Sequence, residues 1–263
     1  MSKNILFIGP TRSGTTFIWS VLLQNSKRHK TFTIHNNKEH YLFEKLYGTK
    51  GFYTEYDKIF NGKISNIDFS PTVFHLLSHR EEIIIDDFFD KIVVIARDPF
   101  SLWKSSYHYS VSDGMAMRGT FDEIVETELC DGYSYDWILK TLQKNPELKK
   151  KLHVIQFDQI TDHKELKTIL IELTNCDVEI PKSSKSHQNS SKKIIPQNYT
   201  FNKLREWVPL EYRRNYAFKI IRRLILKLIP ESNEVQDKNM ERLLAKLICQ
   251  ERKIISEIIK ITN

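Results

Sequence analysis

Two glycines and a run of hydroxyl side chains follow the first apolar stretch of the chain, in residues 9–16 (GPTRSGTT). Gly9 and Gly14 lie five positions apart, between a short apolar run and a stretch with helical spacing. In such a strand-to-helix turn, backbone N–H groups and the helix N-terminus bind phosphate oxygens. The spacing therefore predicts a site for a phosphate or a pair of phosphates.

The residue after the second glycine separates this loop from that of the nucleotide triphosphatases. Their loop has Lys, then Ser or Thr, after that glycine. Here Thr15 stands at the Lys position, and Arg12 supplies the positive charge from inside the loop. A γ-phosphate and its magnesium ion would lack their usual Lys partner. The loop is suited to a phosphate pair and poorly equipped for hydrolysis of ATP or GTP.

A second basic side chain follows the apolar run of residues 91–96 (KIVVIA). Arg97 ends this run, and Pro99 favours the start of a helix directly after it. Ser105 lies eight residues beyond Arg97, on the expected helix. An Arg at a strand end and a Ser two helical turns later can converge on one anion. The sequence thus predicts a second phosphate site.

These two segments resemble the donor-binding motifs of the sulfotransferases that use 3′-phosphoadenosine-5′-phosphosulfate (PAPS). The loop is similar to the family's 5′-phosphosulfate loop, and Arg97 with Ser105 is similar to its 3′-phosphate site. The resemblance implies an enzyme that transfers a sulfuryl group from PAPS to an acceptor hydroxyl and releases adenosine 3′,5′-bisphosphate.

A third segment, residues 187–193 (HQNSSKK), resembles the loop that closes over the nucleotide in many bacterial members of the family. An exposed loop without that role is the alternative. Taken together, the resemblance implies that the donor contacts Arg12, Ser13, Gly14, Thr15, Thr16, Arg97, Ser105, Ser191 and Lys192.

Residues 37–43 (NKEHYLF) resemble the Lys-Glu-x-His-Phe-Phe segment of heparan-sulfate-type sulfotransferases and their bacterial relatives, in which Glu is the general base. By position, Glu39 takes that role and Lys38 lies beside the donor. The segment departs from the pattern, since His40 follows Glu39 directly. His40 or His35 is the alternative base, as histidine is in the cytosolic small-molecule branch. The residues expected at the reacting atoms are Arg12, Lys38, Glu39 and His40, with no metal.

Residues 68–72 (DFSPT) match the Lys-Ser/Thr-Pro segment of the cytosolic small-molecule branch, except that Phe69 replaces the Lys. In the family that Lys is thought to assist the sulfuryl group. Its role is then vacant or filled by another residue, for which Lys38 is the candidate.

Short apolar runs predict four buried strands, at residues 4–8, 66–69, 92–96 and 153–157. Helical spacing predicts helices at residues 16–24, 101–109, 135–144, 164–173 and 240–259. Strands that alternate with helices indicate a parallel sheet covered on both faces. The expected fold class is α/β: a P-loop-type three-layer α/β/α sandwich with a central parallel sheet, plus C-terminal helices.

The 263 residues fit one sulfotransferase domain, residues 1–263, with a C-terminal helical extension at about residues 201–263. Within this extension, residues 213–229, from Arg213 to Ile229, carry six basic residues and no acidic one. A basic amphipathic helix can lie on an anionic membrane surface. A helix packed on the core with a solvated face is the alternative.

The net charge of +7 favours anionic partners without choosing among them. The apolar run at residues 5–8 is too short for a signal sequence or a membrane anchor, so we expect a cytoplasmic protein. The segment around Glu39 implies a carbohydrate acceptor, with a lipid or small-molecule hydroxyl as the alternative. We expect no nucleic-acid partner. A nucleotide kinase or a non-catalytic nucleotide-binding protein is the rival from another functional class.

Overall fold

The computed structural model describes residues 3–36, 38, 41–60, 64–76, 79–113, 121–125, 132–181 and 238–262. The chain divides into two compact units. The first unit comprises Met1–Asp98, Tyr135–Gln188 and Arg252–Asn263, and the second comprises Pro99–Ser134 and Asn189–Glu251. That the chain is a single domain stays a prediction.

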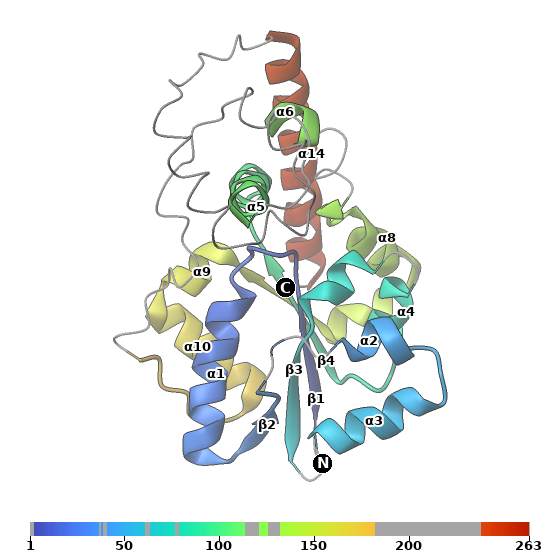
Figure 1. The fold of residues 1–263 in the computed structure, drawn as a ribbon, viewed down its shortest axis with the longest axis vertical. Helices are drawn as coiled ribbons and strands as arrows, with labels where there is room; N and C mark the ends of the chain where they lie inside the picture. The colour runs from blue at the N-terminus through green and yellow to red at the C-terminus, as the bar shows by residue number, and fades with distance from the viewer. Residues whose placement is uncertain are drawn as a thin grey trace, which may run out of the picture. The chain divides into compact units, whose positions relative to one another are not determined.

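A five-stranded, all-parallel sheet forms the centre of the first unit (Figure 1). Its strands, in the spatial order β2-β3-β1-β4-β5, are β2 (Phe32–Ile34), β3 (Ser65–Phe69), β1 (Asn4–Ile8), β4 (Lys91–Ala96) and β5 (Leu152–Gln156). Strands β2 and β3 lie on one side of β1, and the later strands β4 and β5 lie on its other side. Open parallel sheets bind ligands at the carboxyl ends of the strands where the strand order reverses in this way. In this sheet that place is the end of β1.

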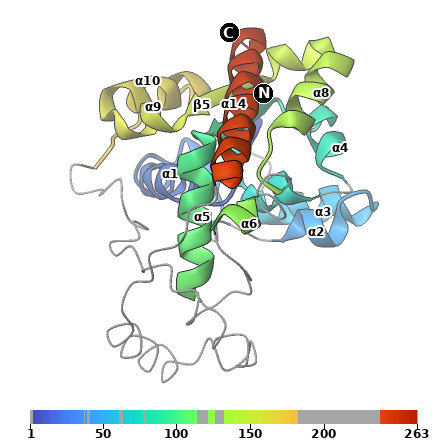
Figure 2. The ribbon, with the colours of Figure 1, turned by 90° about the horizontal axis from the view of Figure 1, so that it is seen from above.

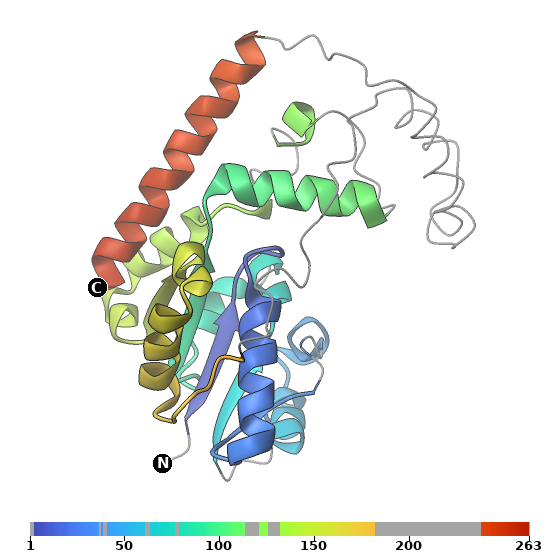
Figure 3. The same cartoon turned by 90° about the vertical axis from the view of Figure 1, so that its left-hand side faces the viewer.

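Helices cover both faces of the sheet (Figures 1 and 2). One face carries α1 (Thr15–His29), α9 (Phe157–Thr161) and α10 (His163–Thr174). The other side carries α2 (Leu42–Leu46), α3 (Gly51–Phe60), α4 (Arg80–Ile85) and α8 (Asp136–Lys144). The short helices η1 (Pro71–His75) and η3 (Pro146–Lys150) follow β3 and α8 in the chain. The C-terminal helix α14 (Lys238–Thr262) is one continuous helix (Figure 3). The predicted α/β sandwich with a C-terminal helix is confirmed.

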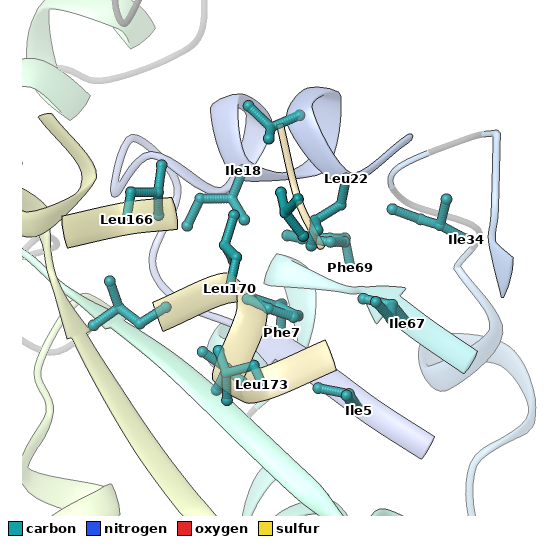
Figure 4. Packing of buried hydrophobic residues seen from close by; sticks show 14 of the residues in the cluster. Ile5, Phe7, Ile18, Leu22, Ile34, Ile67, Phe69, Leu166, Leu170 and Leu173 are labelled. Carbon is teal, nitrogen blue, oxygen red and sulfur yellow. The ribbon is translucent and has the colours of Figure 1, made fainter. Parts of the chain in front are cut away.

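The core on the α1 face follows from residue spacing (Figure 4). Ile5 and Phe7 lie two apart on β1 and so point to the same side of the sheet. Helix α1 meets them with Ile18 and Leu22, which share one helical face. Helix α10 adds residues at the same spacing: Leu166, Leu170 and Leu173. This packing fixes α1, and with it the loop that precedes α1, against the centre of the sheet.

The opposite side is rich in aromatic residues. Phe52, Tyr56 and Phe60 recur every four residues along α3 and are fully buried. Phe43 of α2 packs against Phe52, with ring centroids 5.2 Å apart. Burial, and next the carboxylate of Asp68, raise the pKa of Tyr56, so its hydroxyl stays protonated. The i, i+4 repeat of α3 was visible in the sequence, but we did not predict this helix.

The predicted strand at residues 153–157 differs from the observed one at its end. Strand β5 ends at Gln156, and Phe157 is the first residue of α9. The Gln156 backbone N–H donates to the Gln159 side chain at 2.8 Å, within a capping box that starts the helix. Phe157 is apolar, so the sequence pattern extended the predicted strand to this residue. The capping box ends the strand at Gln156 instead.

In the second unit, Pro99 opens α5 (Pro99–Asp113), as predicted, and α6 (Phe121–Ile124) follows. The ring of Phe121 packs against those of Phe100 and Tyr107, at centroid distances of 6.0 and 5.6 Å. The basic segment at residues 213–229 lies outside the described residues. In the part of the chain that the structure describes, no helix is both long and apolar enough to cross a membrane.

Removing the buried side chain of Leu170 tests the α1-face core. We expect Leu170→Ala to lower the free energy of unfolding by about 2–5 kcal/mol, because it removes transfer energy and leaves a cavity. Urea denaturation measures this change. Thr168→Ala, at an exposed position of the same helix, is the control and should change stability by less than about 0.5 kcal/mol. Equal losses in the two variants would contradict the observed packing of α10.

Candidate functional site

The segment at residues 9–14 joins β1 to α1 in a tightly curled conformation. Arg12 has φ +73° and Gly14 has φ +103°, while Ser13 between them has negative φ. The N–H of Ser13 donates to the carbonyl of Pro10 at 3.1 Å, and the N–H of Phe17 donates to that of Gly14 at 3.0 Å. Alternating left- and right-handed residues form backbone nests that bind anions. This loop therefore offers such a nest at the N-terminus of the fifteen-residue helix α1.

Both glycines of the loop are sterically constrained. A Cβ on Gly9 would lie 2.9 Å from Ser13 Oγ and 3.2 Å from the carbonyl oxygen of Ile95. A Cβ on Gly14 would lie 3.1 Å from Ile160 Cδ1. The loop thus packs directly against the end of β4 and the start of α9. These close contacts, and not turn geometry alone, explain the glycine at each position.

The hydroxyl of Ser13 has an unusual environment. The residue is fully buried, and Oγ has no hydrogen-bond partner among the described residues. A buried polar group without a partner costs about 1–3 kcal/mol. A ligand oxygen in the loop would supply the missing partner, as expected of a phosphate cradle.

Lys38 lies at the first turn of α1. Its Nζ donates to Thr16 Oγ1 at 2.9 Å, across 22 positions of sequence. Thr15, one residue earlier, stands where the nucleotide triphosphatases have lysine, and it is buried. Lys38 therefore places an ammonium group at the start of α1, next to a loop that itself has no lysine. Its role in chemistry stays a prediction.

Arg97 joins the end of β4 to the phosphate loop. Its Nη1 donates to the carbonyl of Arg12 at 2.5 Å, and its guanidinium carbon lies 4.2 Å from the ring centroid of Phe157. Its own N–H donates to the hydroxyl of Tyr135 at 3.2 Å, and that hydroxyl donates to the Ile95 carbonyl at 3.1 Å. The side chain and backbone of Arg97 are thus both held in place.

The charge on Arg97 is opposed by burial and by a neighbouring cation, and it is supported by Asp98 and Asp158. Desolvation, and next the nearby charge of Arg12, lower the pKa of Arg97. A guanidinium nevertheless stays protonated at neutral pH. Its Nε is buried and has no hydrogen-bond partner among the described residues. Two neighbouring cations and an unused donor are the arrangement that an anion would stabilise.

Phe69 stands at the lysine position of the Lys-Ser/Thr-Pro motif but has a structural role. It is buried in the core, and its ring stacks on that of Phe7 at a centroid distance of 4.4 Å. Ser70, which follows β3, donates from Oγ to Asp68 Oδ1 at 2.9 Å and is also buried. The lysine's position is therefore filled by a structural residue.

The remaining predicted residues are only partly placed. His35 follows β2, and its carbonyl accepts a hydrogen bond from Trp19 Nε1 at 3.2 Å. Ser105 lies half-buried on α5 in the second unit, so its convergence with Arg97 stays a prediction. The other predicted residues lie outside the described ranges: Glu39, His40, Ser191 and Lys192. Among the described side chains, no group of three His, Cys, Asp or Glu could hold a metal ion.

Sequence reasoning missed His75 and Phe157. The Nε2 atom of His75 accepts a hydrogen bond from the N–H of Thr11 at 3.4 Å, so it contacts the phosphate loop. His75 ends η1, just after β3, and Phe157 directly follows β5. The signal for both was their position after a strand, because the carboxyl ends of parallel strands meet at one edge of the sheet.

Neither a protein-family model nor a curated protein sequence matches the chain. Among solved structures, the chain is similar to a sulfotransferase from Alicyclobacillus acidocaldarius, with a TM-score of 0.50 and 16% sequence identity. The match covers 86% of this chain and 96% of that one. At this low identity the likeness concerns the fold, which the two proteins share over most of their length.

The crowding at Gly14 can be tested against a second glycine with positive φ. Gly48 has φ +80° and open space around its Cα, so Gly48→Ala should cost only the backbone strain of about 1–2 kcal/mol. Gly14→Ala adds the close contact with Ile160, and we expect it to lower the free energy of unfolding by about 1 kcal/mol more. Urea denaturation compares the two. A Gly14 variant as stable as the Gly48 variant would contradict the close packing of the loop.

Proposed function

We propose that the chain is a PAPS-dependent sulfotransferase, which transfers the sulfuryl group of PAPS to an acceptor hydroxyl. The observation that carries the proposal is the joined pair of cationic elements: the loop at residues 9–14 and Arg97, which donates to the Arg12 carbonyl. PAPS carries a 5′-phosphosulfate and a separate 3′-phosphate, and so needs more than a single anion site. The fold shared with a sulfotransferase supports the same reaction.

In this proposal the loop binds the 5′-phosphosulfate. The amides at the start of α1 donate to its oxygens, and so does Ser13 Oγ, which has no partner among the described residues. Gly14, Thr15 and Thr16 supply further amides and hydroxyls. Arg12 offsets the charge that grows on the bridging oxygen as the sulfur–oxygen bond breaks. Thr15 in place of a lysine disfavours ATP, since the γ-phosphate lacks its usual partner.

Arg97 binds the 3′-phosphate in this proposal, together with Ser105. The guanidinium is held by the Arg12 carbonyl and the Phe157 ring, and its Nε has no partner in the part of the chain that the structure describes. A preorganised guanidinium loses little conformational freedom on binding, which raises the affinity. Ser191 and Lys192 then close over the nucleotide.

Lys38 assists the sulfuryl group in place of the lysine that Phe69 replaces. Its hydrogen bond to Thr16 supports this role, because it fixes the ammonium group at the edge of the loop. A cation there stabilises negative charge on the sulfuryl oxygens in the transition state.

Glu39 is the proposed general base, and its neighbour in sequence, Lys38, lies at the loop. The acceptor oxygen attacks sulfur opposite the bridging oxygen, and Glu39 takes the hydroxyl proton. A carboxylate serves this purpose when its surroundings raise its pKa. His40 or His35 is the alternative base.

The proposed acceptor is a carbohydrate hydroxyl, with a lipid or small-molecule hydroxyl as the alternative. The proposed location is the cytoplasm, and no nucleic-acid partner is proposed. Peripheral membrane contact through residues 213–229 is one of two candidate roles of that segment. The resemblance of residues 37–43 to the heparan-sulfate branch supports the carbohydrate.

Nucleotide selectivity tests the donor. At about 100 times its dissociation constant, adenosine 3′,5′-bisphosphate should stabilise the protein by about 2.7 kcal/mol, which raises Tm by about 5–10 °C. ATP with magnesium should have a much smaller effect. Arg97→Ala should abolish the shift relative to its own unliganded Tm, while Lys27→Ala, an exposed position at the far end of α1, should retain it. Stabilisation by ATP with magnesium, but not by adenosine 3′,5′-bisphosphate, would instead favour a kinase.

The base is tested by turnover with labelled PAPS against a panel of glycans, glycolipids and phenols. We expect Glu39→Gln to lower turnover by about 10²–10⁴-fold, the usual contribution of general acid–base catalysis, with unchanged affinity for adenosine 3′,5′-bisphosphate. His40→Gln and His35→Gln are the matched comparisons. A full-rate Glu39 variant beside an inactive histidine variant would reassign the base.

A further inference from the structure

An ion pair lies next to the proposed anion site and involves a residue from the far end of the chain. Arg252 of α14 donates from Nε to Asp98 Oδ2 at 2.7 Å, and its Nη2 lies 2.6 Å from the same oxygen. Asp98 directly follows Arg97, and all three residues belong to the first unit. In the same unit, the buried side chains of Ile254 and Ile258 anchor this part of α14.

The carboxylate of Asp98 has two effects on its neighbour. It lies close enough to Arg97 to stabilise the charged guanidinium and so to oppose the fall in its pKa. The same carboxylate would compete with any anionic ligand for Arg97, because a guanidinium binds carboxylate and phosphate through the same fork of donors. A free Asp98 would therefore weaken the anion site.

The observed contacts give the two charged side chains different partners. Asp98 Oδ2 receives two donors from Arg252, whereas the Arg97 guanidinium contacts the Arg12 carbonyl and the Phe157 ring. The Arg97 Nε remains without a partner among the described residues. We propose that Arg252 is a positioning residue, which holds and neutralises Asp98 so that Arg97 stays available to the anionic donor. The identity of that donor rests on the proposed function.

This role is electrostatic and not primarily structural. The side chains of Arg252 and Asp98 are 59% and 35% exposed, and ion pairs of that exposure add little to stability. A single charge a few ångströms from a partly buried guanidinium changes the potential at a ligand much more than it changes the fold. Loss of Arg252 should therefore weaken anion binding while the protein stays folded.

A charge cycle tests the proposal. Isothermal titration calorimetry with adenosine 3′,5′-bisphosphate, and in parallel with inorganic phosphate, is applied to the full chain and to Arg252→Gln, Asp98→Asn and the double variant. We expect Arg252→Gln to weaken binding about five- to tenfold at low salt and less at high salt. Asp98→Asn should bind as tightly as the parent or more tightly, and the double variant should be within about twofold of the parent. Lys253→Gln, an exposed charge loss at the next position of α14, should also change binding less than about twofold.

A loss of binding in Arg252→Gln without a loss in Asp98→Asn separates this role from a structural one, since mere anchoring of α14 predicts equal losses for both. Three results would each overturn the proposal. They are equal losses of affinity in Arg252→Gln and Asp98→Asn, an unchanged affinity in Arg252→Gln, and a loss of affinity in Lys253→Gln as large as that in Arg252→Gln. If the parent binds phosphate but not the nucleotide, the proposed donor is wrong, and the phosphate titrations still decide the role of Arg252. If the parent binds neither, both proposals fail, because Arg97 then has no anion to bind.

Discussion

The hydrogen bond from Arg97 Nη1 to the Arg12 carbonyl, 2.5 Å long, joins the two strand ends on which the candidate site depends. Strands β1 and β4 pair in register, with Ile8 opposite Val94, so their carboxyl ends lie side by side. One strand continues into the phosphate loop and the other into Arg97. The bond therefore locks a backbone nest to a guanidinium, although it also brings the cation of Arg97 close to that of Arg12.

Proximity of two cations opposes folding in the absence of an anion, and the surrounding structure compensates for it. The Phe157 ring covers the Arg97 guanidinium, and Tyr135 fixes its backbone. The loop also packs closely against its neighbours at Gly9 and Gly14. Rigid surroundings of this kind preorganise a site, because the charges are already oriented when the ligand arrives. The proposed function uses this preorganisation for a doubly anionic nucleotide.

The central part of the fold could be predicted from the sequence because its signals are local. The apolar runs of β1 and β4 and the glycine spacing of the loop each lie within a few residues. Strand β2 has only three residues, and α2 and α4 have five and six, too short for a clear hydrophobic period.

The contacts that complete the site join residues that are far apart in the sequence, so no local signal predicts them. The bonds of Arg97 to Arg12 and of Arg252 to Asp98 join residues 85 and 154 positions apart, and only the folded chain brings them together. Lys38 shows both situations. Resemblance predicted that it lies beside the donor, whereas its bond to Thr16 required the fold.

The central claim is that one nucleotide engages both the loop and Arg97. A crystal structure of the full chain with adenosine 3′,5′-bisphosphate tests it most directly. We expect the 5′-phosphate against the amides of residues 14–16 and Ser13 Oγ, with the 3′-phosphate within hydrogen-bonding distance of Arg97. A nucleotide bound elsewhere, or one whose 3′-phosphate does not contact Arg97, would contradict it.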